Sequence, residues 1–315
     1  MNIMPGLINP LQLKKKGVLG INQRNSDYIM RYNQRRLYPL VDDKLQTKQL
    51  AIDAGIAVPK LYSIIKYNHQ RKNIANLIAK YDDFVIKPAH GSGGNGILVI
   101  TGKIGQQYKT PSGEMMSLNA VKHYVSNILS GMYSLGGVPD RAFFEYRIKF
   151  DPIFDEISFK GVPDIRIIVF RGIPISAMIR LPTSQSNGKA NLHQGAIGVG
   201  INIATGCTTH GVIGNQTTTT HPDTGKTIKN IQIPRWKEIL TIAVKCSDTV
   251  GLGYLGVDLV LDKMLGPLML ELNARPGLNV QIANQHGLLT NLNKIEKLEK
   301  LPNKVEQRVM YAQTL

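Results

Sequence analysis

Residues 257–277 read VDLVLDKMLGPLMLELNARPG, and this segment is the most informative one for the fold. Two apolar runs flank a turn at residues 262–267, which predicts two antiparallel strands joined as a hairpin. Side chains alternate along a strand, so Glu271 and Asn273 share one face, and the hairpin brings Asp258 beside them. Two carboxylates and an amide oxygen on one sheet face predict a Mg²⁺ site that waters and phosphates complete. The alternative is an ordinary polar strand face.

A second chemical signal is the glycine cluster GSGGNG at residues 91–96. It matches the GxGxxG pattern of dinucleotide-binding loops, but that fingerprint needs a helix after the loop, and residues 97–100 predict a strand. A protein-kinase loop is excluded because HRD and DFG sequences are absent. The remaining interpretation is a glycine hairpin with Lys87 just upstream, where backbone amides and an ammonium group can approach phosphate oxygens. The alternative is a lysine beside an ordinary turn.

The composition is that of a globular protein with an unusual charge. Its 315 residues suggest one large domain or two modest ones, and 43% of them are hydrophobic. The 38 basic and 22 acidic residues give a net charge of +16, which attracts polyanions. The alternative is a solvated basic surface. No RNP-type aromatic pattern or zinc knuckle accompanies the charge, so we expect no nucleic-acid partner.

The sequence also bears on the compartment. No uncharged apolar run approaches the ~18 residues of a membrane span, and residues 1–17 lack the apolar core of a signal peptide. Cys207 and Cys246 stand alone, which favours reduced thiols. We therefore expect a cytoplasmic protein without a membrane span. Nothing in the sequence predicts its oligomeric state.

Hydrophobic periodicity and turn residues predict an α+β protein with two lobes that meet near residues 130–142. The expected helices are at residues 42–54, 72–81, 118–132, 234–250 and 289–305. The expected strands are at residues 61–65, 83–87, 97–101, 143–150, 164–170, 173–181, 197–204, 254–261 and 267–273. We expect a loop or hairpin at residues 102–116 and a surface loop at residues 205–228.

Several motifs in a fixed order resemble those of an ATP-grasp enzyme. They are FVIKP at residues 84–88, the glycine cluster, Asp164-Ile-Arg166, Arg180, Asp258, and ELNARPG at residues 271–277. Over about residues 40–290 the sequence is similar to the RimK-type glutamate ligases, and more closely to the alpha-L-glutamate ligase-like proteins. The resemblance implies an ATP-grasp fold whose two α+β lobes grip the nucleotide. Only about 40 residues, rich in Lys and Arg, precede Asp42, so we expect no full Rossmann-like N-terminal domain.

The resemblance also implies a division of the chain. We expect a basic N-terminal arm or cap at residues 1–40 and an N-terminal lobe with the glycine loop at residues 41–140. A C-terminal lobe with the metal site is expected at residues 141–300, followed by a tail at residues 301–315.

Individual roles follow from the resemblance. ATP phosphates would contact Lys44, Lys87, Gly91, Ser92, Gly93, Gly94 and Gly96. Adenine would contact the backbone of Glu145, Tyr146, Arg147 and Ile148, and the ribose would contact Asp151 or Glu156. Two Mg²⁺ ions, with Mn²⁺ as an alternative, would be held by Asp258, Glu271 and Asn273. The transferred phosphoryl group would be steadied by Arg166, Arg180 and Arg275, with Asn191 nearby.

The implied activity is that of a carboxylate–amine ligase, in which ATP converts a carboxylate into an acyl phosphate and an amine then forms an amide. Such chemistry needs positioning and charge neutralisation more than a protein nucleophile. The expected amine is an amino acid such as glutamate, and the expected acceptor is a peptide, protein or polymer. The alternatives are an ATP-binding regulatory or scaffold protein without turnover, and a basic nucleic-acid-binding protein.

Overall fold

The structure is a computed structural model that describes residues 10–91, 93–214 and 216–315. Ser92 of the predicted phosphate loop and residues 1–9 of the predicted arm lie outside the described residues. The described chain forms two compact units. The larger unit contains the described residues up to Val41, Leu50–Ala57 and Phe150–Leu315, and the smaller unit contains Asp42–Gln49 and Val58–Lys149. The predicted functional boundaries at residues 40, 140 and 300 stay a prediction.

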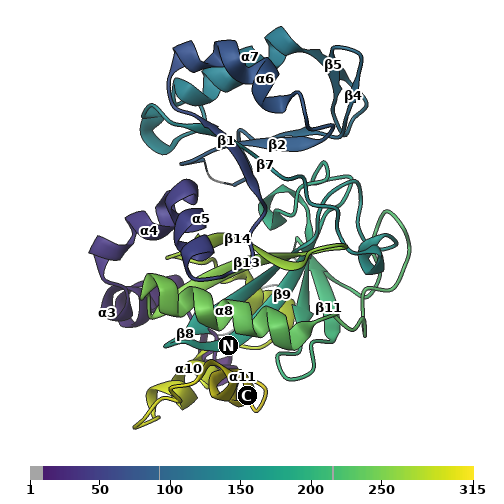
Figure 1. The fold of residues 1–315 in the computed structure, drawn as a ribbon. Helices are drawn as coiled ribbons and strands as arrows, with labels where there is room; N and C mark the ends of the chain where they lie inside the picture. The colour runs from purple at the N-terminus through teal and green to yellow at the C-terminus, as the bar shows by residue number, and fades with distance from the viewer. Residues whose placement is uncertain (1–9, 92, 215) are drawn as a thin grey trace. The chain divides into compact units, whose positions relative to one another are not determined.

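The smaller unit is built on a four-stranded antiparallel sheet with strand order β1-β7-β2-β3 (Figure 1). Its strands are β1 (Leu61–Ile65), β2 (Phe84–Pro88), β3 (Leu98–Ile100) and β7 (Ala142–Glu145). Where a loop or hairpin was expected, a second small sheet forms from β4 (Gly102–Ile104), β5 (Gln107–Lys109) and β6 (Met115–Ser117).

Helices complete the core of the smaller unit. They are η3 (Asn68–Asn73), which leads directly into the short α6 (Ile74–Ile78), and the longer α7 (Leu118–Leu129). Helix α7 begins where the Ser117 hydroxyl accepts the Ala120 N–H at 3.2 Å. Its fully buried Val121, Val125 and Ile128 recur at helical spacing and pack in one cluster with residues of β2 and β7. Helix α5 (Lys44–Asp53) follows Asp43, whose carboxylate accepts the Leu45 N–H at 3.0 Å.

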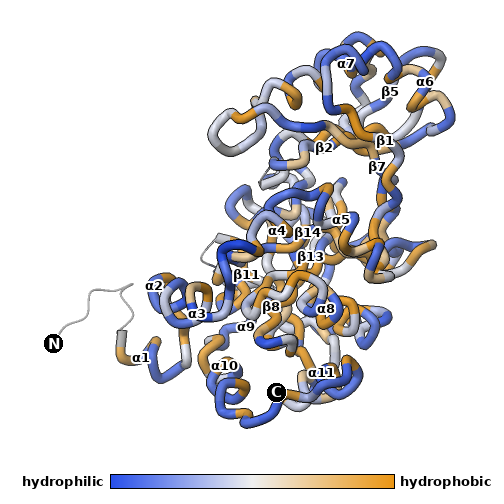
Figure 2. The backbone as a smooth tube through the Cα atoms, turned by 60° about the vertical axis from the view of Figure 1, so that its left-hand side comes forward, coloured by the Kyte–Doolittle hydropathy of each residue, from blue (hydrophilic) through white to orange (hydrophobic). Residues whose placement is uncertain are grey.

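The larger unit contains a seven-stranded antiparallel sheet with the order β12-β11-β10-β9-β8-β13-β14. Its strands are β8 (Asp164–Phe170), β9 (Ile173–Leu181), β10 (Ile197–Ile201), β11 (Thr208–Ile213), β12 (Gln216–Thr218), β13 (Tyr254–Asp262) and β14 (Gly266–Asn273). Strand β13 is buried along its whole length, and Figure 2 shows hydrophobic residues along β8 and β13. These two strands belong to the buried core of the unit, and they carry the charged residues Asp164, Arg166 and Asp258.

Helices cover this sheet. Helix α8 (Trp236–Val250) packs on β8, β9, β13 and β14, and α9 (Asn279–Asn284) packs on β9, β10 and β11. The other helical segments of the C-terminal half are η5 (Pro152–Phe154), η6 (Leu192–Gln194), α10 (Leu289–Glu296) and α11 (Val305–Ala312). In the part of the chain that the structure describes, no helix is both long enough and apolar enough to span a bilayer.

Much of the segment at residues 10–41 is helical, and some of its side chains join the core of the larger unit. Their elements are α1 (Pro10–Lys15), α2 (Ile21–Gln23), η1 (Arg24–Ile29), α3 (Met30–Tyr32), η2 (Arg35–Leu37) and α4 (Pro39–Asp42). Leu19, Tyr28 and Ile29 are buried in one hydrophobic cluster with Phe170 and Tyr254. Only part of this segment is therefore a solvated basic surface, where Lys14, Lys15, Lys16, Arg31, Arg35 and Arg36 are exposed.

The α+β class and most predicted strands are confirmed, and three element predictions are wrong. The strand expected at residues 143–150 ends at Glu145. The loop expected at residues 205–228 contains β11 and β12, because its threonines are β-branched and suit a strand despite their polarity. The single helix expected at residues 289–305 is two helices, since Pro302 lies between them and cannot donate a helical hydrogen bond.

Candidate active site

A largely buried network of two guanidinium groups and two carboxylates lies on neighbouring strands of the larger unit. The register places Asp258 of β13 opposite Arg166 of β8, and Asp164 of β8 opposite Arg180 of β9. Arg166 donates to both Asp258 carboxylate oxygens, at 2.7 and 2.5 Å. Arg180 donates to Asp258 at 2.9 Å and forms a two-point pair with Asp164. Sheet pairing therefore brings together residues that are distant in the sequence.

The network holds its charges in fixed positions. Burial alone would raise the pKa of Asp258, but the guanidinium groups of Arg166 and Arg180 lower it below its usual range. Burial raises the pKa of Asp164, with Arg180 opposing the rise and the Asp258 carboxylate adding to it. Buried ion pairs contribute little net stability but hold their partners in one geometry. Asp164 was quoted in a motif but not predicted as a site residue. Its signal was the two-residue spacing from Arg166, which puts both on one strand face.

The predicted metal ligands Glu271 and Asn273 adjoin this network. Glu271 lies opposite Asp258 in the ladder, and the Asn273 amide donates to Asp258 at 3.4 Å. Both are half-buried. Among the described residues, no three His, Cys, Asp or Glu side chains gather into a metal-binding group. Mg²⁺ commonly binds through one or two carboxylates together with substrate phosphates, so this donor set fits a metal that is partly ligated by a nucleotide. The metal assignment stays a prediction.

Arg275 lies just beyond the end of β14. Its side chain is exposed, and its guanidinium carbon lies 4.9 Å from the centre of the Tyr38 ring. This distance is that of a cation–π contact. Of the three predicted catalytic arginines, Arg166 and Arg180 are thus joined through Asp258, while Arg275 is held by a residue of the N-terminal segment.

Three further predicted site residues have local structural roles. The Asp151 carboxylate caps η5 by accepting the Ile153 N–H at 3.0 Å. The Asn191 side chain caps η6 by accepting the His193 N–H at 3.0 Å. Glu156, the alternative ribose residue, is exposed and pairs with Lys226 at 3.3 Å. These contacts explain the residues as turn caps and surface groups, and their nucleotide roles stay predictions.

In the smaller unit, Glu145 is a buried counterion for two lysines. Its side chain is only 3% exposed, lies 2.9 Å from Lys48 Nζ and forms a second ion pair with Lys87. Burial alone would raise the pKa of Glu145, but Lys87 and Lys48 lower it. The resemblance implied only that the backbone of Glu145 contacts adenine, and it implied no role for Lys48. Lys48 could have been found from its i, i+4 spacing after Lys44, which places both on one helix face.

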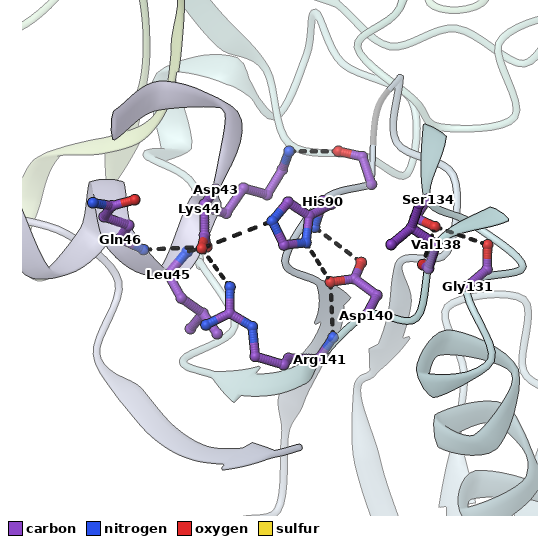
Figure 3. Close-up of polar contacts among 11 residues, drawn as sticks. Asp43, Lys44, Leu45, Gln46, His90, Gly131, Ser134, Val138, Asp140 and Arg141 are labelled. Atoms are coloured by element: carbon purple, nitrogen blue, oxygen red, sulfur yellow. Dashed lines mark hydrogen bonds and ion pairs between the residues drawn. The ribbon is translucent and has the colours of Figure 1, made fainter. Parts of the chain in front are cut away.

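The entry to the glycine loop is held by a polar cluster (Figure 3). Lys44 Nζ donates to the Gly91 carbonyl at 2.5 Å. The Asp140 carboxylate accepts the His90 backbone N–H at 2.9 Å and lies 2.7 Å from His90 Nδ1. The other ring nitrogen of His90 lies 3.8 Å from the Asp43 carboxylate. The predicted phosphate contact Lys44 therefore reaches the loop itself.

The loop depends on glycine at its last position. Gly96 has φ +74°, and a Cβ there would lie 2.5 Å from the Tyr133 ring carbon Cγ. A side chain is excluded by both backbone conformation and space. Gly93 and Gly94 also have positive φ. These glycines lie in the segment that connects the antiparallel strands β2 and β3.

The predicted adenine-binding segment is not a strand beyond Glu145. The Tyr146 N–H donates to the Lys60 carbonyl at 2.9 Å. Arg147 donates to Asp83 at 2.9 and 3.2 Å. Ile148 is buried. The segment is thus anchored within the smaller unit, and its contact with adenine stays a prediction.

The strands that carry the arginine–carboxylate network and the glycine segment after Lys87 contain the motifs on which the resemblance to ATP-grasp enzymes rests. The family model described as "Sugar-transfer associated ATP-grasp" matches residues 23–297. The chain belongs to this family, and the predicted ATP-grasp fold is confirmed. The finer resemblance to RimK-type ligases stays a prediction.

Weak similarity extends to solved ATP-grasp structures. The ligase PsnB with its minimal precursor has TM-score 0.46 at 15% identity, over 90% of this chain and 63% of that chain. D-alanine–D-alanine ligase from Bacillus anthracis has TM-score 0.46 at 13% identity, over 88% and 69%. D-cycloserine synthetase DcsG has TM-score 0.43 at 12% identity, over 89% and 71%. The chain spans less than two thirds of the PsnB chain. No curated protein matches the sequence.

Proposed function

We propose that the protein is an ATP- and Mg²⁺-dependent carboxylate–amine ligase that forms an amide through an acyl phosphate. The observation that carries the proposal is the network of Arg166, Arg180 and Asp258 beside Glu271. It presents fixed cations and carboxylates on adjoining strands, with the cations held by buried partners. Phosphoryl transfer is catalysed chiefly by such preorganised charge.

The chain's residues divide the work by charge. Lys44, Lys87 and the backbone amides of the glycine loop bind and orient the ATP phosphates. Glu145 keeps Lys87 in place through its ion pair. Arg166, Arg180 and Arg275 bind the phosphoryl group in transfer, and neutralise the negative charge that its oxygens carry.

Asp258, Glu271 and the Asn273 amide oxygen would hold Mg²⁺. The ion would supply charge neutralisation at the phosphate oxygens when bound. Two ions, and Mn²⁺ in place of Mg²⁺, belong to this proposal. The adenine is assigned to the backbone at residues 145–148, and the ribose to Asp151.

We assign the amine to an amino acid such as glutamate, and the carboxylate to a peptide, protein or polymer. The net charge of +16 favours an acidic acceptor. The glutamate assignment rests on the sequence resemblance to RimK-type ligases.

A second candidate is an ATP-binding regulatory protein without turnover. The favouring observation is that both carboxylate oxygens of Asp258 accept guanidinium hydrogen bonds. A metal ion at this site must share the Asp258 carboxylate with two arginines. If the arginines keep the metal ion out, the protein binds the nucleotide without transferring its phosphoryl group.

The test is ADP release from Mg·ATP with each L-amino acid added singly. Glu271→Gln removes one carboxylate charge from the proposed metal site, and Glu299→Gln removes one from an exposed position as its control. Release that one amino acid stimulates, retained in Glu299→Gln and lost in Glu271→Gln, supports the ligase. ATP binding without release in every mixture favours the second candidate.

A further inference from the structure

The three residues that follow β14 are held by side chains of the N-terminal segment. Asn33 is only 3% exposed, and its amide donates to the carbonyls of Tyr254 at 2.7 Å and Ala274 at 3.0 Å. The Tyr254 N–H donates back to the Asn33 side-chain oxygen at 2.8 Å. Asn33 therefore pairs with the start of β13 as a neighbouring strand residue would, and it ties Ala274 to that point.

A second N-terminal side chain holds the other end of this short segment. The buried Arg24 guanidinium donates to the Pro276 carbonyl at 2.8 Å and to Asn25 Oδ1 at 3.1 and 2.8 Å. Pro276 also packs closely on β13, because a Cβ on Gly256 would lie 2.6 Å from Pro276 Cβ. The backbone is thus fixed on both sides of Arg275.

The side chain of Arg275 has its own contact with the same segment. Its guanidinium carbon lies 4.9 Å from the centre of the Tyr38 ring. A cation over an aromatic face is attracted by the ring quadrupole. Held carbonyls on either side and a ring beneath the guanidinium restrict both the backbone and the side chain of Arg275.

The holding segment is itself rigidly packed. The ring of Tyr28 meets Phe170 edge-on with 5.5 Å between centroids, and the ring of Tyr32 meets it at 4.8 Å. The backbone of Leu19 exchanges two hydrogen bonds with the Gln281 side chain, at 2.7 and 3.1 Å. Because the segment is held by these contacts, its side chains can fix the positions of Ala274, Arg275 and Pro276.

We infer that Arg24, Asn33 and Tyr38 are positioning residues that hold Arg275 ready for the phosphoryl group in transfer. The inference rests on the proposed function. A guanidinium whose direction is already fixed loses little freedom when it binds an anion, so its interaction strengthens without new contacts. The N-terminal segment is accordingly part of the active site's support, in addition to being a basic surface.

The test uses the full chain and needs no acceptor. Tyr38→Leu removes the aromatic face, Tyr38→Phe retains it, and Arg35→Gln removes an exposed charge from the same segment as the control. The probe is Mg·ADP with fluoroaluminate, which mimics the phosphoryl group in transfer, compared with Mg·ADP alone. We expect Tyr38→Leu to weaken the fluoroaluminate complex on the order of three-fold, with Mg·ADP affinity unchanged. Tyr38→Phe and Arg35→Gln should bind like the parent.

Two results would overturn the inference. One is an equal weakening by Tyr38→Leu in an Arg275→Ala background, since a residue that acts through Arg275 has no effect once Arg275 is gone. The other is an unchanged NMR order parameter of the Arg275 Nε–H in Tyr38→Leu, where we expect a drop. Failure of the parent protein to form the fluoroaluminate complex would instead contradict the proposed function, while the order parameter still decides the positioning role.

Discussion

Asp258 and Arg166 lie opposite each other on neighbouring antiparallel strands, and their side chains form two hydrogen bonds of 2.7 and 2.5 Å. The pair fixes a guanidinium group in the plane of a buried carboxylate. Arg180 joins the same carboxylate at 2.9 Å. The geometry depends on the planar fork of arginine, which a lysine ammonium cannot reproduce.

Arg166→Lys tests this geometry. It keeps the charge and removes the two-point contact, so we expect kcat for ADP release to fall on the order of 100-fold, as for the loss of a preorganised charge contact. The matched control is Arg235→Lys, which changes an exposed arginine paired with Glu238. Full activity of Arg166→Lys would contradict the catalytic assignment of the network.

Glu145→Gln tests the buried lysine pair. At pH 7 the change leaves Lys48 and Lys87 without their counterion, and we expect a loss of about 3 kcal/mol in the free energy of unfolding. Urea unfolding measures it. Glu114→Gln, at an exposed position, should change stability little.

The same variant predicts a pH dependence. The pKa of Glu145 in the folded protein lies below its usual 4.5, so the unfolded chain binds more protons there. Its stabilising contribution is therefore complete above pH 4.5 and is lost as the pH falls through the folded-state pKa. We expect the stability difference between the parent and Glu145→Gln to shrink below pH 4.5. A difference that is constant between pH 7 and pH 3 would contradict the ion pair.

Asp140→Asn tests the anchor of the glycine loop. The buried Asp140 carboxylate accepts the backbone N–H groups of His90 and Arg141, at 2.9 and 2.7 Å, and contacts the His90 ring. An asparagine has one acceptor oxygen, so one buried donor loses its partner, at a cost of about 1–3 kcal/mol.

Because Gly91 follows His90 directly, we also expect the KM for ATP to rise in Asp140→Asn. Asp155→Asn, at an exposed position of the larger unit, is the control. A stability loss with an unchanged KM would show that Asp140 supports the fold and leaves the loop's function alone.

Strand pairing made much of the site predictable. Alternation along residues 257–277 correctly placed Asp258 and Glu271 together, because a hairpin with a short turn permits few registers. The neighbouring strands β8 and β9 were also predicted with their observed bounds, as both are mostly apolar and carry their charged residues near one end. The contact between Arg166 and Asp258 could not be predicted, because it depends on the order of the strands in the sheet, which hydrophobic periodicity does not reveal.

Other parts depended on tertiary contacts that a linear pattern does not contain. Asn33 resembles a loop residue in the sequence, yet it is buried because it pairs with Tyr254 across 221 positions. Glu145 resembles a polar interruption of a strand, and only the fold supplies its two lysine partners. The Thr-rich strands β11 and β12 were missed because composition suggested a loop and the pairing partner decided the outcome.

Hydroxylamine trapping would show whether the protein activates a carboxylate as an acyl phosphate. This small nucleophile takes the place of an unknown amine and converts an acyl phosphate into a hydroxamate. We would incubate the protein with Mg·ATP, hydroxylamine and each of a panel of carboxylates that includes the L-amino acids and polyglutamate. The account predicts hydroxamate and ADP in equal amounts with one carboxylate, and neither in Glu271→Gln. ADP release without hydroxamate, or equal product from Glu271→Gln, would contradict it.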